Sequence, residues 1–217
     1  DGIPLFPFGK STSKGAGLSS GCHHRVQHQQ PCTRRVQLGG VLRLCQTDPQ
    51  IKTHGPPMQL IDTHTHLDCE EFDADRHETL SRARLAGVSR MLVMGITQQH
   101  WGRLWRLVVS EPGLFAAFGL HPVYLDQHRP DHLAQLHALL TAHRSDSRLC
   151  AVGEIGLDYF VTELDRGQQL HYLEAQLELA REFELPVLLH VRRAHADMIA
   201  TLKRFRLPRA GIVHAFA

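Results

Sequence analysis

The chain has 217 residues, of which 42% are hydrophobic and 21% charged, values typical of a globular protein that can bury a sizeable core. It contains no run of about 18 apolar residues and no early apolar stretch of signal-peptide length, so we expect a cytoplasmic protein without a membrane partner. The formal net charge of +2 divides unevenly, with +5 over residues 1–57 and −3 over the rest. The globular part is thus not basic overall, so any nucleic-acid contact there would have to be local.

Residues 1–57 differ in composition from the rest of the chain. They are rich in Gly, Ser, Pro, Gln and Arg, show no sustained helical or strand period, and are followed by Met58 just before the first clear strand. We therefore interpret residues 1–57 as a disordered or non-native N-terminal extension. The alternative is a zinc module in this segment, although its spacing matches no familiar zinc pattern. Its ligands would come from Cys22, His23, His24, His28, Cys32 and Cys45.

From residue 58 onward, apolar strand-like runs alternate with helix-like segments. Strands are predicted over residues 59–64, 88–96, 114–120, 149–155, 186–191 and 211–216. Helices are predicted at about residues 74–86, 98–110, 131–144, 166–184 and 194–206. Apolar strands separated by amphipathic helices indicate parallel β/α units in an α/β protein.

The position of the polar residues favours a TIM (β/α)8-type barrel over a doubly wound sheet. A Rossmann-type sheet would have glycines after its first strand, whereas this chain has His64-Thr65-His66 there. Six units account for residues 58–217, so we expect a partial barrel, truncated after its sixth strand. Cys150 lies inside an apolar run, and the five cysteines contain no C-x-x-C pair, so a disulfide framework is not expected.

Four predicted strands end in a side chain that can bind a metal. In an extended segment His64 and His66 point to the same side and can share one ion. Glu154 follows a short apolar run and can bridge two ions, because its two oxygens have separate lone pairs. His190 and His214 each close a compact apolar strand. In a barrel, such strand ends meet at one rim, which is where barrel enzymes build their sites.

Five motifs in this order resemble those of the TatD family of metal-dependent deoxyribonucleases, which are amidohydrolase-type TIM barrels. The resemblance covers residues 59–217 and is carried by His64-x-His66, Gly119-Leu120-His121-Pro122, Gly153-Glu154-Ile155-Gly156-Leu157-Asp158, Leu189-His190-Val191-Arg192 and Val213-His214-Ala215-Phe216. It implies a hydrolase that cleaves phosphodiester bonds of DNA with two divalent ions, Mg, Mn or Zn. Paired ions of this kind activate a water and hold the oxygens of an in-line displacement at phosphorus.

The resemblance also implies a role for each matching residue. His64 and His66 would hold the first ion, Glu154 would bridge, and His190 with His214 would hold the second. Glu154 and His121 are the expected catalytic residues. His121, Arg192 and Asp158 are the expected substrate-binding residues: His121 orients a phosphate or donates a proton, and Arg192 grips a phosphate with its planar guanidinium. Asp158 is either a partner of a ligand or a loop cap. Arg193 and Lys203 either extend this grip on phosphate or lie on a solvated helix surface, and the second is the expectation.

One feature of the family has no counterpart here. The family has an aspartate ligand near the end of its eighth strand, and this chain stops at Ala217, before a seventh. We therefore expect a fragment of a longer gene product, weakly active or inactive by itself. Two alternatives to a DNA phosphodiesterase stay open: a related ester or amide hydrolase, and an inactive remnant or binding module. No protein partner is indicated.

Overall fold

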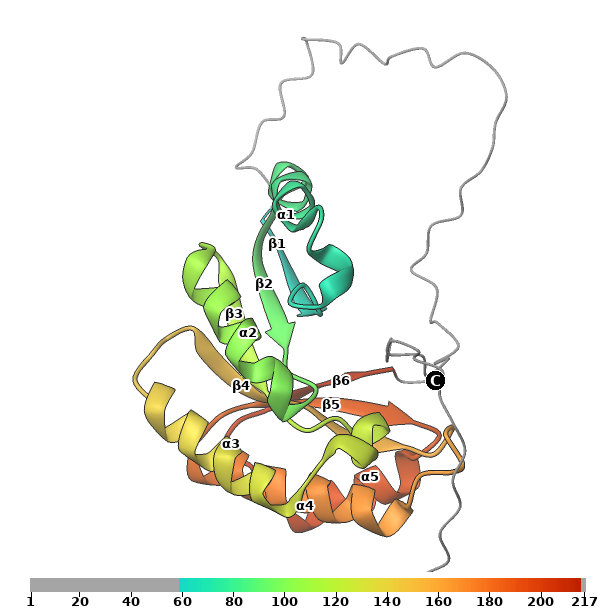
Figure 1. Ribbon diagram of the computed structural model, residues 1–217. Coiled ribbons are helices and arrows are strands. Elements are labelled where there is room, and N and C mark those ends of the chain that lie inside the picture. Colours follow the sequence, from blue (N-terminus) through green and yellow to red (C-terminus); the bar gives the residue numbers. More distant parts are fainter. Residues whose placement is uncertain (1–58, 216–217) are drawn as a thin grey trace, which may run out of the picture. The chain divides into compact units, whose positions relative to one another are not determined.

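The computed structural model describes residues 59–215, so the predictions for residues 1–57 lie outside the described residues. Its centre is one parallel sheet of six strands in the order β1-β2-β3-β4-β5-β6 (Figure 1). The strands are β1 (Leu60–Thr65), β2 (Val88–Met94), β3 (Leu114–Phe118), β4 (Leu149–Asp158), β5 (Val187–Arg192) and β6 (Gly211–His214). Because neighbours in sequence are neighbours in the sheet, every crossover runs in the same sense, as in a barrel.

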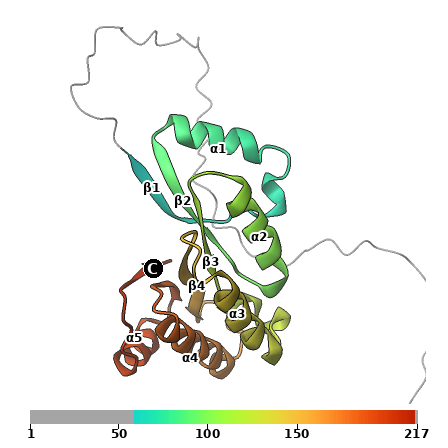
Figure 2. The same ribbon diagram turned by 90° about the vertical axis from the view of Figure 1, so that its left-hand side faces the viewer.

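Five α-helices connect the strands and cover the outer side of the curved sheet (Figure 2). They are α1 (Arg76–Leu85), α2 (Gln98–Ser110), α3 (Pro130–His143), α4 (Arg166–Glu182) and α5 (His195–Arg204). Two short 3-10 helices, η1 (Glu70–Phe72) and η2 (Pro122–Gln127), follow the first and third strands. None of the helices in the described part of the chain is long and apolar enough to span a bilayer.

The predicted α/β barrel-type fold is confirmed, as are all six strands and five helices, with ends within a few residues of the expected ones. The largest difference is at β4, which continues three residues further than predicted and carries Asp158 into the sheet. The two 3-10 helices were not predicted, because runs this short leave no periodic signal.

The core has two layers, one on each side of the sheet. The larger layer lies between the strands and the helices and includes Phe118, Leu173 and Leu177. The smaller layer lies on the other face of the sheet and consists of Met94, Ala117, Ala151 and Leu188, with Cys150 packed at its margin. Burial raises the pKa of the Cys150 thiol to about 12, so this cysteine is a packed, protonated thiol, as expected from its apolar surroundings.

Two glycines let β4 and β5 approach each other on either side of Glu154. A Cβ atom at Gly153 would lie 2.6 Å from Cβ of Leu188, and one at Gly156 would lie 2.0 Å from the carbonyl oxygen of His190. Real side chains do not tolerate such contacts, so any other residue would push the two strands apart. The glycines thereby hold the backbone of Glu154 close to that of His190.

Candidate metal centre

Glu154 is the centre of a cluster of histidines at the carboxyl ends of the strands. It lies in β4, its side chain is 2% exposed, and four imidazoles from two other strands and one turn face its carboxylate. His64 and His66 come from the end of β1, His190 from β5, and His121 from the turn after β3. Parallel strands bring their carboxyl ends to one rim, which explains how residues 126 positions apart meet.

The two oxygens of Glu154 face different pairs of histidines. Oε2 lies 3.3 Å from Nε2 of His64 and 3.5 Å from Nε2 of His66. Oε1 lies 3.3 Å from Nε2 of His121 and 3.0 Å from Nδ1 of His190. A carboxylate placed in this way between two sets of nitrogen donors has the arrangement needed to bridge two cations.

His214 joins the cluster at the end of β6. Its ring stacks on that of His64, with centroids 3.7 Å apart and planes 13° from parallel. By position, the donor atoms form two groups of three: His64, Glu154 and His214 in one, and His121, Glu154 and His190 in the other. This grouping differs from the expected pairs, in which His214 lies with His190 and His121 faces the substrate.

The protonation of the cluster follows from its burial. Burial lowers the pKa of His66 to about 4 against the opposing attraction of Glu154, and it also lowers the pKa values of His121 and His214. Burial also acts to raise the pKa of Glu154, but the facing imidazoles, His121 foremost, outweigh it and hold that pKa well below the usual range. Glu154 is therefore ionised, and burial favours the neutral imidazole at His66, His121 and His214, which is the form that binds metal.

His190 differs from the other histidines because both its nitrogens face carboxylates. Nδ1 lies 3.0 Å from Oε1 of Glu154, and Nε2 lies 2.8 Å from Oδ2 of Asp158. Burial acts to lower the pKa of His190, but the hydrogen bonds to Asp158 and Glu154 raise it to about 9. A proton on His190 thus stands where a cation shared with Glu154 would be bound.

Asp158 combines both of the roles considered for it. Its Oδ2 accepts a hydrogen bond from His190, and its Oδ1 accepts hydrogen bonds from the backbone N–H groups of Phe160 and Val161. The carboxylate thus orients the imidazole and caps the turn after β4. A carboxylate behind a histidine in this way fixes the ring and its tautomer, as is usual behind metal-binding histidines.

A further observation indicates that these residues can hold a pair of cations. Among the described residues, Nε2 of His64 is buried without a hydrogen bond of acceptable geometry, although it lies close to Glu154. A buried nitrogen without a partner costs free energy unless a ligand satisfies it. Imidazole and carboxylate donors together suit zinc, manganese or a similar divalent ion, and the donor types alone do not choose among these.

Two glutamines that sequence reasoning missed hold the backbone beside the site. Gln176 of α4 accepts a hydrogen bond from N–H of Leu120 (2.7 Å) and donates one to its carbonyl oxygen (3.2 Å). Gln169 makes the same pair of bonds with Asp158, at 2.7 and 2.9 Å. Both glutamines are fully buried. Their spacing of seven residues, on the apolar stripe of the helix, was the available signal.

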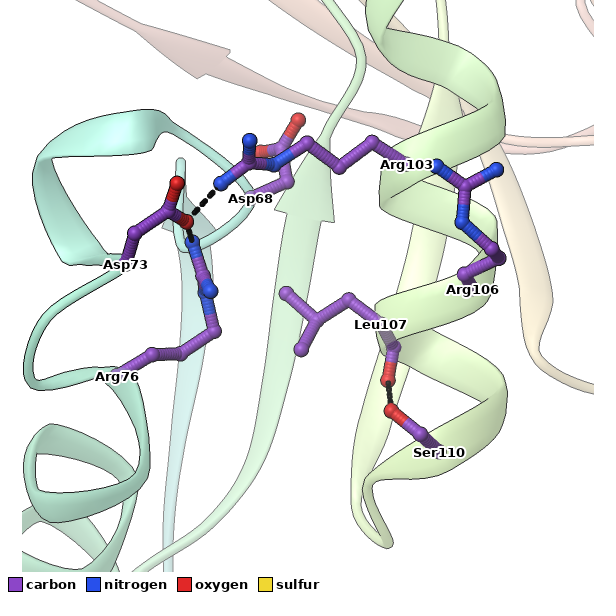
Figure 3. Close-up of a pocket in the computed structure, with 7 residues that line it drawn as sticks. All are labelled: Asp68, Asp73, Arg76, Arg103, Arg106, Leu107 and Ser110. Atoms are coloured by element: carbon purple, nitrogen blue, oxygen red, sulfur yellow. Dashed lines mark hydrogen bonds and ion pairs between the residues drawn. The ribbon is translucent and has the colours of Figure 1, made fainter.

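A hollow of about 420 Å³ lies away from the cluster, between η1, α1 and α2 (Figure 3). Asp73 pairs there with both Arg76 and Arg103 (Figure 3). Arg76 also donates to the carbonyl oxygens of Leu67 and Cys69, at 2.6 and 2.9 Å. Since Asp73, Arg76 and Arg103 satisfy one another or bond to backbone carbonyls, these three residues brace the loop after His66. Asp68, which also lines the hollow, has an oxygen buried without a hydrogen bond to any described residue.

The fold and the cluster together define the chain as a parallel β/α barrel-type protein with histidine and carboxylate donors at the rim. The chain belongs to the TatD related DNase family, whose family model matches residues 61–217. The expected resemblance is confirmed by this match.

Known relatives agree with the family assignment. The chain is 40% identical to the uncharacterized metal-dependent hydrolase YjjV of Escherichia coli K12, covering 73% of this chain and 61% of that protein. It is 33% identical to the 3'-5' ssDNA/RNA exonuclease TatD of Cronobacter sakazakii, covering 72% and 59%. The crystal structure of YjjV matches with a TM-score of 0.69 over 73% of this chain and 60% of that one. The chain thus spans about three fifths of the length of these relatives.

Proposed function

We propose that these residues form most of the active site of a metal-dependent hydrolase that cleaves phosphodiester bonds in single-stranded nucleic acid. The observation that carries the proposal is the position of Glu154, whose two oxygens each face a separate pair of histidine nitrogens. The name of the Cronobacter relative, a single-strand exonuclease, supports the substrate class. The name of YjjV supports hydrolysis that depends on metal.

The residues that would hold the ions are Glu154, His64, His66, His190 and His214. Two divalent ions at such a site activate a water and offset the negative charge that develops on phosphate oxygens. The protein would keep Glu154 ionised, favour the neutral form of His66 and His214 by burial, and orient His190 through Asp158. For His190 to bind a cation beside Glu154, its Nδ1 must release a proton while Nε2–H stays bonded to Asp158.

His121 is proposed as a hydrogen-bond donor and not as a ligand. Its Nδ1 accepts a hydrogen bond from the backbone N–H of Val123 at 3.1 Å, so in the neutral imidazole the proton lies on Nε2. That Nε2–H is directed at Glu154, where it would meet a phosphate oxygen bound at the centre. The residue is thus suited to orient a phosphate or to protonate the leaving oxygen.

Arg192 is the third proposed contact to substrate. It ends β5, two residues after His190, and its backbone carbonyl accepts a hydrogen bond from Tyr159 N–H at 2.8 Å, which fixes its place at the rim. Among the described residues its guanidinium makes no ion pair, so its donors are available to a phosphate.

The test is an assay of the full chain with end-labelled single-stranded DNA, with Mn²⁺ or Mg²⁺ and with chelator. We expect weak, metal-dependent release of nucleotides that the Glu154→Gln variant lacks. Hydrolysis of an acyl ester with no cleavage of DNA would favour the alternative hydrolase. Metal binding below stoichiometric levels together with no turnover would contradict the proposal and favour an inactive module.

A further inference from the structure

We propose that the rim beside the metal centre carries a platform of arginines and aromatic rings that binds the phosphates and bases of a nucleic-acid strand beyond the scissile bond. We call this set the arginine platform, and it consists of Tyr159, Phe160, Arg166, Arg192 and Arg193. The inference rests on the proposed function, because it names how that site would recognise a strand longer than one nucleotide.

Two aromatic rings hold the three guanidinium groups in place. The Arg192 guanidinium lies 3.7 Å from the centre of the Phe160 ring, and that of Arg193 lies 4.8 Å from the same centre. Arg166 lies 4.3 Å from the centre of the Tyr159 ring. A guanidinium on an aromatic face keeps its N–H donors at its edge, where they remain available to a phosphate.

The charges of the platform are not neutralised by the chain. None of the three arginines makes an ion pair with another described residue. Other exposed arginines, such as Arg90 and Arg106, also lack one, so the platform is distinguished by the gathering of three such charges around two aromatic rings. The nearby carboxylates are already engaged: Asp158 bonds to His190, and Asp197 accepts a hydrogen bond from the Tyr159 hydroxyl at 2.7 Å. Three unpaired cations on one rim would attract a polyanion.

The platform is exposed and adjoins the cluster through the chain itself. Phe160 is 37% exposed, an uncommon position for a ring that could be buried, and Arg166 and Arg193 are exposed as well. Tyr159 and Phe160 directly follow Asp158, and Arg192 is the register partner of Asp158 in the sheet. A strand whose phosphate lies at Glu154 would therefore have its neighbouring nucleotides over these residues.

Arg193 also adopts a backbone conformation that side chains usually avoid. Its φ of 52° lies in the left-handed region, where glycine or asparagine is more common. It precedes α5, which begins at His195, so it does not lie on the solvated helix surface where we expected it. The conformation directs the side chain back to Phe160 and the rim.

A single strand fits this chemistry better than a duplex or a free phosphate. Rings and guanidinium planes stack with unpaired bases of any sequence, while the guanidinium edges bind the linking phosphates. A duplex hides its base faces, and a lone phosphate makes no use of rings. The platform therefore predicts affinity that rises with the length of a single strand.

The platform can be tested by binding, apart from catalysis. The probe is a fluorescent oligodeoxythymidylate of about 12 nucleotides, titrated in chelator with the full chain between roughly 50 and 200 mM KCl. We expect Arg193→Ala and Arg166→Ala each to weaken binding by roughly 5- to 10-fold. Each should also lower the slope of log K against log salt by about 0.7. Phe160→Leu, which keeps an apolar side chain without the ring, should weaken binding by at least about 5-fold.

Arg144→Ala is the matched control. Arg144 also lies over an aromatic ring, that of Phe183 at 5.9 Å, but it follows α3 and lies before the start of β4, at the opposite end of the strands. This variant loses the same charge and should bind as the parent does. Equal losses in Arg144→Ala and Arg193→Ala, or no loss in Arg193→Ala, would overturn the platform.

Hydrolysis of bis(p-nitrophenyl) phosphate with Mn²⁺ separates the two proposals. This small diester reaches the metal centre without using Phe160, Arg166 or Arg193. Strand binding that depends on the platform, with no hydrolysis of the diester, would support the platform and contradict the proposed function. Hydrolysis with strand binding unchanged in the arginine variants would support the proposed function and overturn the platform.

Discussion

The metal centre and the hollow between α1 and α2 both gather charged side chains, yet they satisfy them in opposite ways. In the hollow, Asp73 pairs with Arg76 and Arg103, and the remaining donors of Arg76 bind backbone carbonyls. In the centre, one carboxylate faces four imidazoles, and burial lowers the pKa values of two of them, His66 and His121.

The difference shows how a site for a ligand can be told from a structural ion-pair network. Groups that stabilise a fold close on each other, because an unpaired buried charge is costly. Groups kept for a ligand face one another without an arginine or lysine between them, so a cation can bind in its place. A substitution in the centre should therefore affect metal binding more than stability, and one in the hollow should do the reverse.

The largest expected effect comes from Glu154→Gln. The amide cannot bridge, and its NH₂ group would face histidine nitrogens that need a cation, so affinity for Mn²⁺ should fall by more than about 100-fold, and DNA hydrolysis with it. Calorimetric titration of the metal-free chain measures the change. Glu182→Gln is the control, because that exposed glutamate pairs only with His137 and should bind metal as the parent does. Retained stoichiometric binding of two ions by Glu154→Gln would contradict its proposed role.

A smaller effect is expected from Asp158→Asn. The amide keeps the shape of the side chain and can still accept from Phe160 N–H, but it no longer holds a charged partner on Nε2 of His190. Metal affinity should fall by roughly 10- to 100-fold, the usual effect of losing a carboxylate behind a ligand histidine. The same titration measures it. An unchanged metal affinity would show that Asp158 only caps the turn after β4 and does not support the binding of metal by His190.

The sequence predicted the fold and the members of the centre better than their arrangement. Apolar runs interrupted by amphipathic helices were enough for the strands and helices, because period and burial set both. The end-of-strand position of His64, Glu154 and His190 placed them at one rim. The partition of donor atoms did not follow from spacing, because it depends on how the sheet curves and on which side of Glu154 each ring falls.

Tertiary contacts without a sequence period were not predictable. Gln176 bonds to Leu120 across 56 residues, and nothing local distinguishes it from an exposed glutamine except its place on the apolar stripe of α4. The stacking of Arg193 on Phe160 likewise depends on the positive φ of Arg193, which no local sequence pattern predicts.

Gln176→Leu tests a residue that supports the site through the stability of the fold. The substitution keeps most of the volume but leaves N–H and C=O of Leu120 without partners in a buried place. We expect a loss of about 1–3 kcal/mol in the free energy of unfolding. Because Leu120 precedes His121, hydrolysis should also decline. Urea denaturation followed by circular dichroism measures the free energy of unfolding. A stability equal to that of the parent would show that the hydrogen bonds of Gln176 to Leu120 do not stabilise the fold.

Arg76→Ala tests the hollow itself. It removes bonds to Asp73 and to the carbonyls of Leu67 and Cys69, so stability should fall by about 1–2 kcal/mol, while affinity for Mn²⁺ should change less than in Asp158→Asn. Arg82→Ala is the matched control: that arginine is exposed, pairs with Asp75 and Glu78, and should cost less than about 0.5 kcal/mol. If Arg76→Ala instead lowered the affinity for Mn²⁺ as much as Asp158→Asn and left the free energy of unfolding unchanged, the hollow would be part of the metal site.

The smallest effect is the pH dependence of the metal-free chain, where two histidines of the centre act in opposite senses. The pKa of His190 is raised to about 9, so its contribution to stability is fully present below pH 6.5 and is lost as the pH rises through 9. The pKa of His66 is lowered to about 4, so the unfolded chain takes up a proton below pH 6.5 that the folded chain does not, and stability falls from there toward pH 4. Melting temperatures in chelator should therefore decline on both sides of pH 6.5. In His190→Gln the decline between pH 6.5 and 9 should disappear while the acid decline remains, whereas an alkaline decline equal to that of the parent would show that His190 carries no excess proton between Glu154 and Asp158.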